Sequence, residues 1–371
     1  MSASAPAPQL LDAFENQDGR FAAAFSVLRE GIAERVFPAC SVAITGQGRL
    51  VALRAFGNFT FEPESPVTRP STLFDLASVT KVVATTSMAM LLYQRGLLDL
   101  EAPVCAILPE FVSDREKDPR RRDVTFRMLL AHYSGLPAYE KLFLKARTRE
   151  DLLRAAFTMA LVADPGSRAE YSDIGFILLG TALERIADEA LDRYCLREIF
   201  APFGMIGTTF NPPAEIRSQI PPTADHCGFR HRLIQGEVQD ENASVLGGVA
   251  GHAGVFSTAA DVAKFAHAML KGGCGVLRPE TVALFTRRES APAGTSRTLG
   301  WDTPTQPSQS GRYFGPASFG HLGYTGTSLW IDPDRDISIT LLTNRTWPDC
   351  SNHAIKQIRP RFHDAVIQSQ L

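Results

Sequence analysis

The sequence predicts an α+β protein in which one antiparallel β-sheet, built from both ends of the chain, carries an inserted and mostly helical lobe. Runs with the alternation and turns of β-strands occur at residues 40–57 and 327–345, whereas helical spacing dominates between residues 79 and 190. We therefore expect a discontinuous sheet domain, residues 1–75 and 245–371, and a helical domain, residues 76–244. A functional site is expected at the seam between them.

The terminal elements follow from short local patterns. Residues 10–38 have the spacing of an amphipathic helix that ends at Pro38, and residues 40–57 read as two short strands around a Gly-Gln-Gly turn, hence a hairpin. Two further strands in residues 327–345 flank a Pro-Asp-Arg-Asp turn. The tail, residues 351–370, has helical spacing that Pro360 interrupts.

The middle of the chain contains four stretches with helical spacing, separated by loops that contain Pro and Gly. These stretches are residues 82–96, 125–136, 149–160 and 174–189. No repeat of 20 to 50 residues is present, which argues against a solenoid.

Composition excludes several classes of function. The 371 residues carry a net charge of -2 and contain no basic run interleaved with aromatics, so neither nucleic acid nor an anionic membrane is an expected partner. The first 20 residues lack the pattern of a secretory signal, and the longest apolar stretch, between Lys81 and Gln94, is too short to span a bilayer. A cytoplasmic protein is expected, and the sequence does not indicate its oligomeric state.

The cysteine pattern predicts reduced thiols, mostly in the core, because no two cysteines form a C-x-x-C pair. They are Cys40, Cys105, Cys195, Cys227, Cys274 and Cys350. His226 and His231 lie near Cys227, but their spacing is not that of a closed zinc site, so no metal is expected.

The stretch "FDLASVTKVVATTSMAMLL" places Ser78 three residues before Lys81, at the start of an apolar run. Residues three apart share a helix face, so the serine would have an amine within reach at the positive end of a helix. Lys81 could act as a base only if burial lowers its pKa. A serine at this place is equally a good helix N-cap, and so short a motif also arises by chance. The motif alone leaves both interpretations open.

Two other motifs follow in the chain: Tyr171-Ser172-Asp173 before a second apolar helix, and His321-Leu322-Gly323 before a turn and a strand. In order and spacing the three motifs resemble the signature of the serine β-lactamase and penicillin-binding protein superfamily, which is S-x-x-K, Y-x-N, and K-T-G or H-x-G. Residues 125–137 and 247–265 also resemble stretches of that superfamily.

The resemblance extends from about residue 37 to residue 348 and is closest to the class C β-lactamase-like branch, which includes family VIII esterases and D-aminopeptidases. It implies the β-lactamase/transpeptidase-like fold, with an active site at the seam of the two domains. A conventional α/β-hydrolase is disfavoured, because the chain contains no G-x-S-x-G motif.

The resemblance implies a role for each matching residue. Ser78 would attack a carbonyl and become acylated. Lys81 would keep Ser78 and Tyr171 in a productive protonation state, and Tyr171, held as a phenolate by Lys81, would act as general base and then as proton donor. The backbone N–H groups of Ser78 and Tyr324 would form the oxyanion hole. No metal or organic cofactor is implied.

Five residues are expected to bind the substrate: Asp173, His321, Gly323, Tyr324 and His252. For His252, packing and substrate contact both stay open. His132 is expected to satisfy buried backbone near a helix end.

Three departures from the superfamily pattern bear on the substrate. Asp173 stands where many relatives have Asn, and an aspartate can only accept hydrogen bonds; it could pair with Lys81, pair with a substrate amine, or cap the helix. His321 and Leu322 replace residues that capture the carboxylate of a β-lactam, and a histidine is only partly charged near neutral pH.

We therefore expect a serine hydrolase that acts on small-molecule esters or amides, chiefly an esterase with weak or no β-lactamase activity. The alternatives are a β-lactamase, a D-amino-acid peptidase or amidase, an acyltransferase on the same scaffold and, least expected, a non-catalytic binding module.

Overall fold

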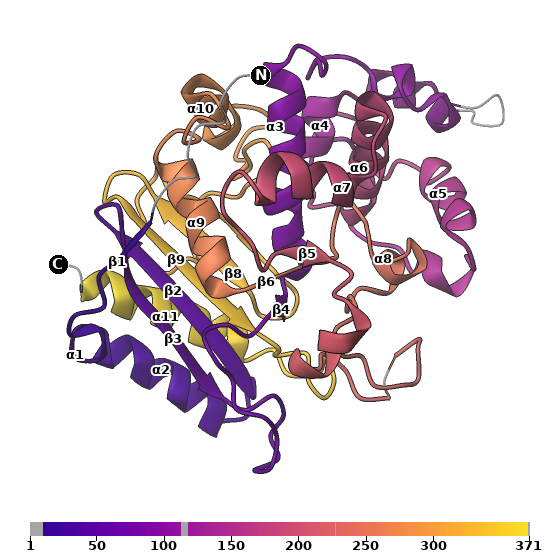
Figure 1. Ribbon diagram of the computed structural model, residues 1–371. Coiled ribbons are helices and arrows are strands. Elements are labelled where there is room, and N and C mark those ends of the chain that lie inside the picture. Colours follow the sequence, from indigo (N-terminus) through magenta and orange to yellow (C-terminus); the bar gives the residue numbers. More distant parts are fainter. Residues whose placement is uncertain (1–9, 113–117, 227, 370–371) are drawn as a thin grey trace.

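The computed structural model describes residues 10–112, 118–226 and 228–369. It contains a six-stranded sheet, with helices on both faces, beside a mostly helical lobe (Figure 1). The predicted fold class is therefore confirmed. The boundaries of the sheet domain, residues 1–75 and 245–371, and of the helical domain, residues 76–244, stay a prediction.

The large sheet draws its strands from both ends of the chain, in the order β1-β3-β2-β9-β8-β7. The strands are β1 (Leu11–Asp12), β2 (Ala39–Gly46), β3 (Arg49–Gly57), β7 (Phe319–Leu322), β8 (Ser328–Asp332) and β9 (Ile337–Thr343). The two halves join where β2 pairs antiparallel with β9, with Ala43 opposite Thr340. All other neighbouring strands are also antiparallel except β1, which pairs parallel with β3.

The β2–β3 hairpin forms as predicted, and its turn explains why. Gln47 and Gly48 both have positive φ angles, of 51° and 75°. Two successive positive φ angles match the twist of the flanking strands, and Gly48 adopts this conformation without a steric cost.

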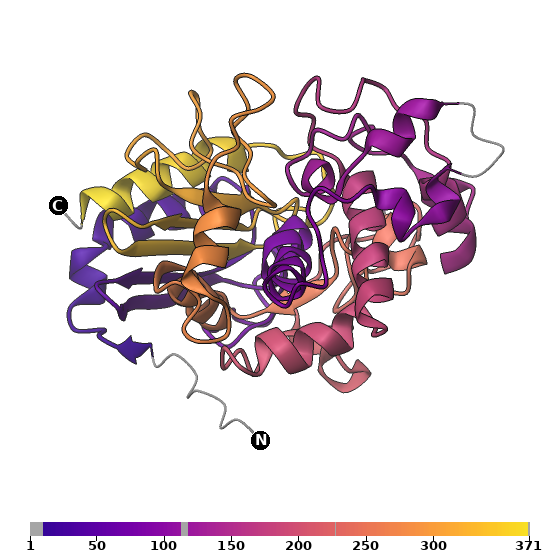
Figure 2. The same cartoon turned by 90° about the horizontal axis from the view of Figure 1, so that it is seen from above.

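Helices cover both faces of the sheet (Figures 1 and 2). Val42 and Ile44 pack with α2 (Ala22–Ala33) and α11 (Ile355–Gln368) on one face. Ala43, between them in the strand, packs on the other face with α9 (Ala259–Leu270). This is the period-two alternation of a strand that is buried on both sides.

Two of the expected terminal helices differ from the prediction. The N-terminal helix does not begin at residue 10, because Leu11–Asp12 forms β1 and only α1 (Gln17–Arg20) and α2 are helical. Pro360 lies inside α11 instead of interrupting it. A proline removes the donor for the carbonyl four residues earlier, and here the Lys356 carbonyl accepts a hydrogen bond from Gln309 Nε2 at 3.1 Å.

The remaining helices belong mostly to the lobe beside the sheet. They are α3 (Ser87–Gln94), α4 (Phe126–Leu130), α5 (Arg149–Phe157), α6 (Asp173–Ala187), α7 (Leu191–Cys195) and α8 (Glu241–Val245), with α10 (Pro279–Thr286) nearer the sheet. A small second sheet, in the order β4-β6-β5, consists of β4 (Phe74–Asp75), β5 (Thr209–Phe210) and β6 (Val255–Ser257).

The segment before α3 departs from a regular α-helix. A 3₁₀ turn, Ala77–Val79, leads into a π-helix, Lys81–Thr86, and only then into α3. All six residues of the π-helix are buried. Wide π-helical turns occur frequently at functional sites, and this one begins at Lys81, just after the 3₁₀ turn that contains Ser78.

The described cysteines form no disulfide. Cys40 and Cys195 are buried, whereas Cys105, Cys274 and Cys350 are partly exposed, so the prediction that the cysteines lie mostly in the core is wrong; Cys227 lies outside the described residues. Within those residues, no helix combines the length and apolar character needed to cross a membrane.

Candidate active site

A cavity of about 980 Å³ lies where the edge of the sheet meets the helical lobe. Its lining includes residues from all three predicted motifs and from the turn after β7: Ser78, Tyr171, Asp173, His321, Gly323 and Tyr324. Segments far apart in the sequence therefore line one cavity.

Ser78 is partly exposed to the cavity from the 3₁₀ turn. The preceding residue, Ala77, has a φ of 47°, which is uncommon for a residue with a side chain. Buried Asp75 holds this turn by accepting the N–H groups of Ala77 at 2.8 Å and Gln239 at 2.7 Å. Ser78 makes no helix-capping hydrogen bond, so the interpretation of this serine as an N-cap is wrong.

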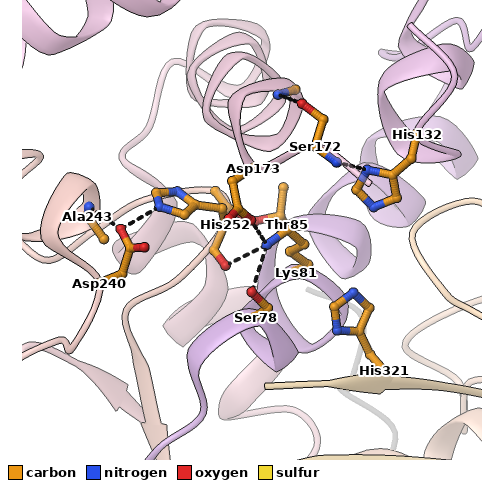
Figure 3. A network of polar contacts seen from close by, with 12 residues as sticks. Ser78, Lys81, Thr85, His132, Ser172, Asp173, Asp240, Ala243, His252 and His321 are labelled. Carbon is orange, nitrogen blue, oxygen red and sulfur yellow. Dashed lines mark hydrogen bonds and ion pairs between the residues drawn. The ribbon is translucent and has the colours of Figure 1, made fainter. Parts of the chain in front are cut away.

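The Lys81 ammonium is fully buried and has three hydrogen-bond acceptors (Figure 3). Nζ lies 3.0 Å from Ser78 Oγ, 2.6 Å from Asp173 Oδ1 and 3.0 Å from the carbonyl oxygen of His252. An ammonium group has three donors, so these contacts use its full capacity. The lysine is therefore held in one position beside the serine.

Asp173 determines the charge state of Lys81. Burial lowers the pKa of Lys81, but the Asp173 carboxylate and then Tyr171 outweigh it, and the net effect is a raised pKa. The condition under which Lys81 could act as a base, a pKa lowered by burial, is therefore not met. At rest the residue is an ammonium ion paired with Asp173, whose side chain is 16% exposed.

Tyr171 lies against the same cluster. Its ring centroid is 4.9 Å from Lys81 Nζ, and its hydroxyl is within hydrogen-bonding reach of Lys81 and Ser78. Burial and the Asp173 charge raise the pKa of Tyr171 against the opposing effect of Lys81. The resting site therefore holds a neutral phenol and not the expected phenolate.

The start of α6 positions both Tyr171 and Asp173. Ser172 is the N-cap, since its Oγ accepts the Gly175 N–H at 3.0 Å, and Asp173 is the first helical residue. The N-cap alternative for Asp173 is therefore wrong, and its alternative as a partner of Lys81 is confirmed. The N–H of Ser172 donates to His132 Nδ1 at 3.0 Å, which confirms that His132 satisfies buried backbone at a helix end.

Replacing Asp173 tests this electrostatic account. Asp173 raises the pKa of both Lys81 and Tyr171, so Asp173→Asn should ease loss of the proton that the pair shares. We expect the alkaline rise of kcat/KM for an aryl ester to move to lower pH. A profile at the wild-type position would contradict this account, and the off-site variant Asp261→Asn is the control.

The turn after β7 brings a second backbone donor to Ser78. A Cβ at Gly323 would lie 2.6 Å from the Leu76 carbonyl oxygen, so only glycine permits this close approach of β7 to the serine turn. Within the described parts of the chain, the N–H groups of Ser78 and Tyr324 donate no hydrogen bond. Two unused donors beside the serine hydroxyl suit a developing oxyanion.

His321 is a neutral acceptor. Burial, with help from the nearby cations Lys81 and Arg297, lowers the pKa of His321 to about 3. Its Nδ1–H donates to the Leu322 carbonyl at 2.8 Å, and its Nε2 has no partner among the described residues. The expectation of partial charge near neutral pH is therefore wrong.

His252 does not line the cavity, so its prediction as a substrate contact is wrong. It is 1% exposed, and its Nε2–H donates to Asp240 Oδ1 at 2.8 Å while its carbonyl holds Lys81 (Figure 3). Asp240 also caps α8 by accepting the Ala243 N–H at 2.7 Å. The sequence analysis assigned no role to Asp240.

Two arginines of the cavity were not predicted either. Arg297 lies 5.4 Å from the centre of the Tyr171 ring and 3.4 Å from Asp302, and Arg359 reaches the cavity from α11. No motif surrounds either residue. In the described residues, no group of three or more His, Cys, Asp or Glu side chains is arranged to hold a metal ion.

Comparisons of the sequence agree on one family. The family model described as Beta-lactamase matches residues 24–359. The N-acetylmuramyl-L-alanine amidase of Bacillus subtilis (strain 168) is 32% identical over 347 residues, which cover 83% of this chain and 77% of that protein. A protein of Escherichia coli (strain K12) named "Putative D-alanyl-D-alanine carboxypeptidase" is 31% identical over 346 residues, covering 83% and 79%.

Solved structures share the fold. EstCE1, described as a hydrolase with promiscuous acyltransferase activity, superposes with a TM-score of 0.75 at 24% identity, covering 94% of this chain and 99% of its own. The octameric penicillin-binding protein homologue from Pyrococcus abyssi gives 0.72 at 21% identity, covering 94% and 77%. At these identities the likeness concerns the fold alone.

Proposed function

The chain belongs to the beta-lactamase family and is a hydrolase, and from this premise we propose that it cleaves small-molecule carboxylic esters through an acyl-enzyme on Ser78. One observation carries the proposal: Ser78 Oγ, open to the cavity, lies 3.0 Å from the buried Lys81 ammonium, with Tyr171 beside both. A hydroxyl, a cation and a proton carrier in one cluster are the parts that acyl transfer needs.

The proposed acylation begins when the Lys81–Tyr171 pair loses one proton, leaving the phenolate form of Tyr171 beside the Lys81 ammonium. The phenolate takes the Ser78 proton as Oγ attacks the ester carbonyl carbon, and the oxyanion is bound by the N–H groups of Ser78 and Tyr324. Tyr171 then gives this proton to the departing alkoxide, which leaves as an alcohol.

Deacylation uses the same groups with water. The phenolate accepts a proton from water while the hydroxide attacks the acyl carbon. When the intermediate collapses, Tyr171 returns the proton to Ser78 Oγ and the carboxylic acid leaves. Asp173 keeps the Lys81 ammonium in place throughout, because their separation is only 2.6 Å.

Esters suit this site better than amides for a chemical reason. An alkoxide leaves more readily than an amide nitrogen, which must be protonated first. Asp173 accepts hydrogen bonds from Lys81 where an asparagine could donate one to a substrate amide carbonyl.

Amide hydrolysis is the second candidate, and one observation favours it. The Bacillus subtilis protein, 32% identical to this chain, is named as an amidase. The Escherichia coli protein, 31% identical, is named "Putative D-alanyl-D-alanine carboxypeptidase". Both names describe enzymes that cleave amide bonds. The same serine, lysine and tyrosine would serve that reaction.

The test compares three substrates: p-nitrophenyl butyrate, D-alanine p-nitroanilide and a chromogenic cephalosporin. We expect the ester to be turned over most rapidly, Ser78→Ala to reduce turnover to the background rate, and mass spectrometry of quenched enzyme to find one butyryl group on the peptide containing Ser78. Faster anilide cleavage would favour the amidase, and faster cephalosporin cleavage the β-lactamase. Ester turnover that survives in Ser78→Ala would refute the proposal.

A further inference from the structure

The two N–H groups proposed to bind the oxyanion come from turns that lie far apart in the sequence. Ser78 belongs to the 3₁₀ turn Ala77–Val79. Tyr324 belongs to the turn between β7 and β8, in which the Gly326 N–H donates to the Gly323 carbonyl at 3.0 Å. Two donors aimed at one oxygen stabilise its charge only if their positions are set in advance. Contacts outside the two turns must therefore fix their separation.

Asp75 contacts the neighbours of both donors. Its Oδ1 accepts the N–H of Ala77, which precedes Ser78, at 2.8 Å. Its backbone carbonyl accepts the hydroxyl of Thr325, which follows Tyr324, at 2.8 Å, across a sequence separation of 250 residues. One residue at the end of the short strand β4 therefore joins the two turns directly.

The Asp75 carboxylate is well suited to hold the serine turn. It belongs to a residue that is 2% exposed, and its Oδ2 accepts the Gln239 N–H at 2.7 Å. Burial raises the pKa of Asp75 to about 6 against the opposing effect of the Gln239 and Ala77 N–H groups, so at neutral pH it is ionised and both oxygens accept. Ala77, with its φ of 47°, has an uncommon backbone conformation that persists only where contacts hold it.

Thr325 completes the connection from the side of the sheet. It is fully buried, and its carbonyl accepts the Thr343 hydroxyl at 2.6 Å and the Arg345 N–H at 3.0 Å, which fasten the turn to the end of β9. Its Oγ1 also lies 3.1 Å from Thr327 Oγ1. Because a carbonyl oxygen can only accept, the Thr325 hydroxyl donates to Asp75 and accepts from Thr327.

We infer that Asp75 and Thr325 are positioning residues, which set the separation of the Ser78 and Tyr324 N–H groups and so determine how well the site binds the oxyanion. The inference rests on the proposed function, in which these two groups receive the charge of the tetrahedral intermediate. Neither Asp75 nor Thr325 lines the cavity, so each acts through its neighbour. Since the oxyanion forms only along the reaction path, the connection should affect the rate and leave substrate binding unchanged.

Thr325→Val tests the connection, because valine keeps the shape of threonine and lacks the hydroxyl. We expect the acylation rate constant, from the p-nitrophenol burst with p-nitrophenyl butyrate, to fall by about 10- to 100-fold, with little change in the substrate concentration that half-saturates it. Thr325→Ser retains a hydroxyl and should keep most of the rate. Asp75→Asn, whose amide offers one acceptor oxygen in place of two, should show a loss of the same kind.

A sulfur-containing substrate separates positioning from a general loss of structure. In O-(4-nitrophenyl) thionobutyrate the carbonyl oxygen is replaced by sulfur, a larger atom and a weak hydrogen-bond acceptor. After correction for the reactions with hydroxide, the wild type should prefer the oxygen ester by about 10²-fold or more. Thr325→Val and Asp75→Asn should lower this preference by about tenfold, because misplaced donors discriminate less between the two atoms. Partial unfolding would slow both esters equally.

Thr45→Val is the matched control, away from the cavity. Thr45 is 1% exposed, and its hydroxyl lies 2.6 Å from Ser338 Oγ within the sheet. Its loss removes a buried hydroxyl of the same kind, so this variant should keep both the acylation rate and the preference for the oxygen ester.

An unchanged preference in either folded variant, Thr325→Val or Asp75→Asn, would overturn the inference. An equal fall in Thr45→Val would also overturn it, because any buried hydroxyl would then have the same effect. If no ester is hydrolysed at all, the proposed function fails by itself, and crystal structures decide the inference. The distance between the Ser78 and Tyr324 backbone nitrogens should then differ between the wild type and Thr325→Val, and the same distance in both would refute it.

Discussion

Lys81→Met is expected to lower kcat/KM for p-nitrophenyl butyrate by about 10³-fold or more, since the variant lacks the cation that stabilises a Tyr171 phenolate and holds Ser78 Oγ at 3.0 Å. It should also lower the free energy of unfolding by about 3–5 kcal/mol, because Asp173, largely buried, would lose its only cationic partner in the described structure. Steady-state kinetics and urea denaturation measure the two effects separately.

A second substitution separates catalysis from stability. In the double variant Lys81→Met with Asp173→Asn, the uncompensated charge is gone, so we expect most of the stability to return without recovery of activity. Lys264→Met is the matched control outside the cavity, where Lys264 pairs with Asp261 at 2.8 Å. It should affect stability only.

The opposite pattern would contradict the assignment. If the double variant regained both stability and turnover, Lys81 would serve only to neutralise Asp173. If the single variant kept wild-type turnover, the proton transfers would not involve Lys81 at all.

The sequence predicts the framework of this site well, because its signals are local. Alternating strands with Gly-rich or Pro-Asp turns define β2, β3, β8 and β9, and the order of three short motifs brings Ser78, Tyr171 and His321 to one cavity. Each of these signals depends on residues close together in the chain. The positive φ angles at residues 47–48 and the hydrogen bond from the Gly175 N–H to Ser172 Oγ are local features of this kind.

The charge states could not be predicted in the same way, because they depend on contacts between distant segments. Whether the pKa of Lys81 is raised or lowered depends on two opposing effects. The Asp173 carboxylate, which comes from α6, raises it, and burial of the lysine lowers it. The charge on His321 depends on its burial and on Arg297, which no motif marks. A sequence lists these residues without the distances that decide between the competing effects.

The position of Arg359 at the cavity could not be predicted from the sequence either. In the sequence Arg359 is one of the two arginines that flank Pro360 in an amphipathic tail, with nothing to distinguish it from its exposed neighbour Arg361. Only the packing of α11 against the sheet places one arginine at the cavity and the other opposite Glu30. The C-terminal helix α11 therefore packs against the sheet and also contributes a residue to the lining of the cavity.

Replacing Tyr171 by phenylalanine tests the proposed proton transfers directly. Tyr171→Phe should lower the rate of acylation by p-nitrophenyl butyrate by about 10²–10⁴-fold, the usual effect of removing an acid–base group, and should leave the free energy of unfolding nearly unchanged. The variant should also lose the alkaline rise of kcat/KM, because burial and Asp173 raise the pKa of Tyr171 and its ionised form is the reactive one. Stopped-flow measurement of the p-nitrophenol burst reports acylation directly.

The control for this variant is Tyr194→Phe, which removes a hydroxyl that accepts a hydrogen bond from Arg95 at 3.0 Å, away from the cavity. It should acylate at the wild-type rate. Unchanged acylation in Tyr171→Phe would transfer the base role to Lys81, the other member of the pair that shares the proton. Because Asp173 favours the charged form of Lys81, that outcome would require Asp173 to release the lysine during turnover, and a faster Asp173→Asn enzyme would then be expected.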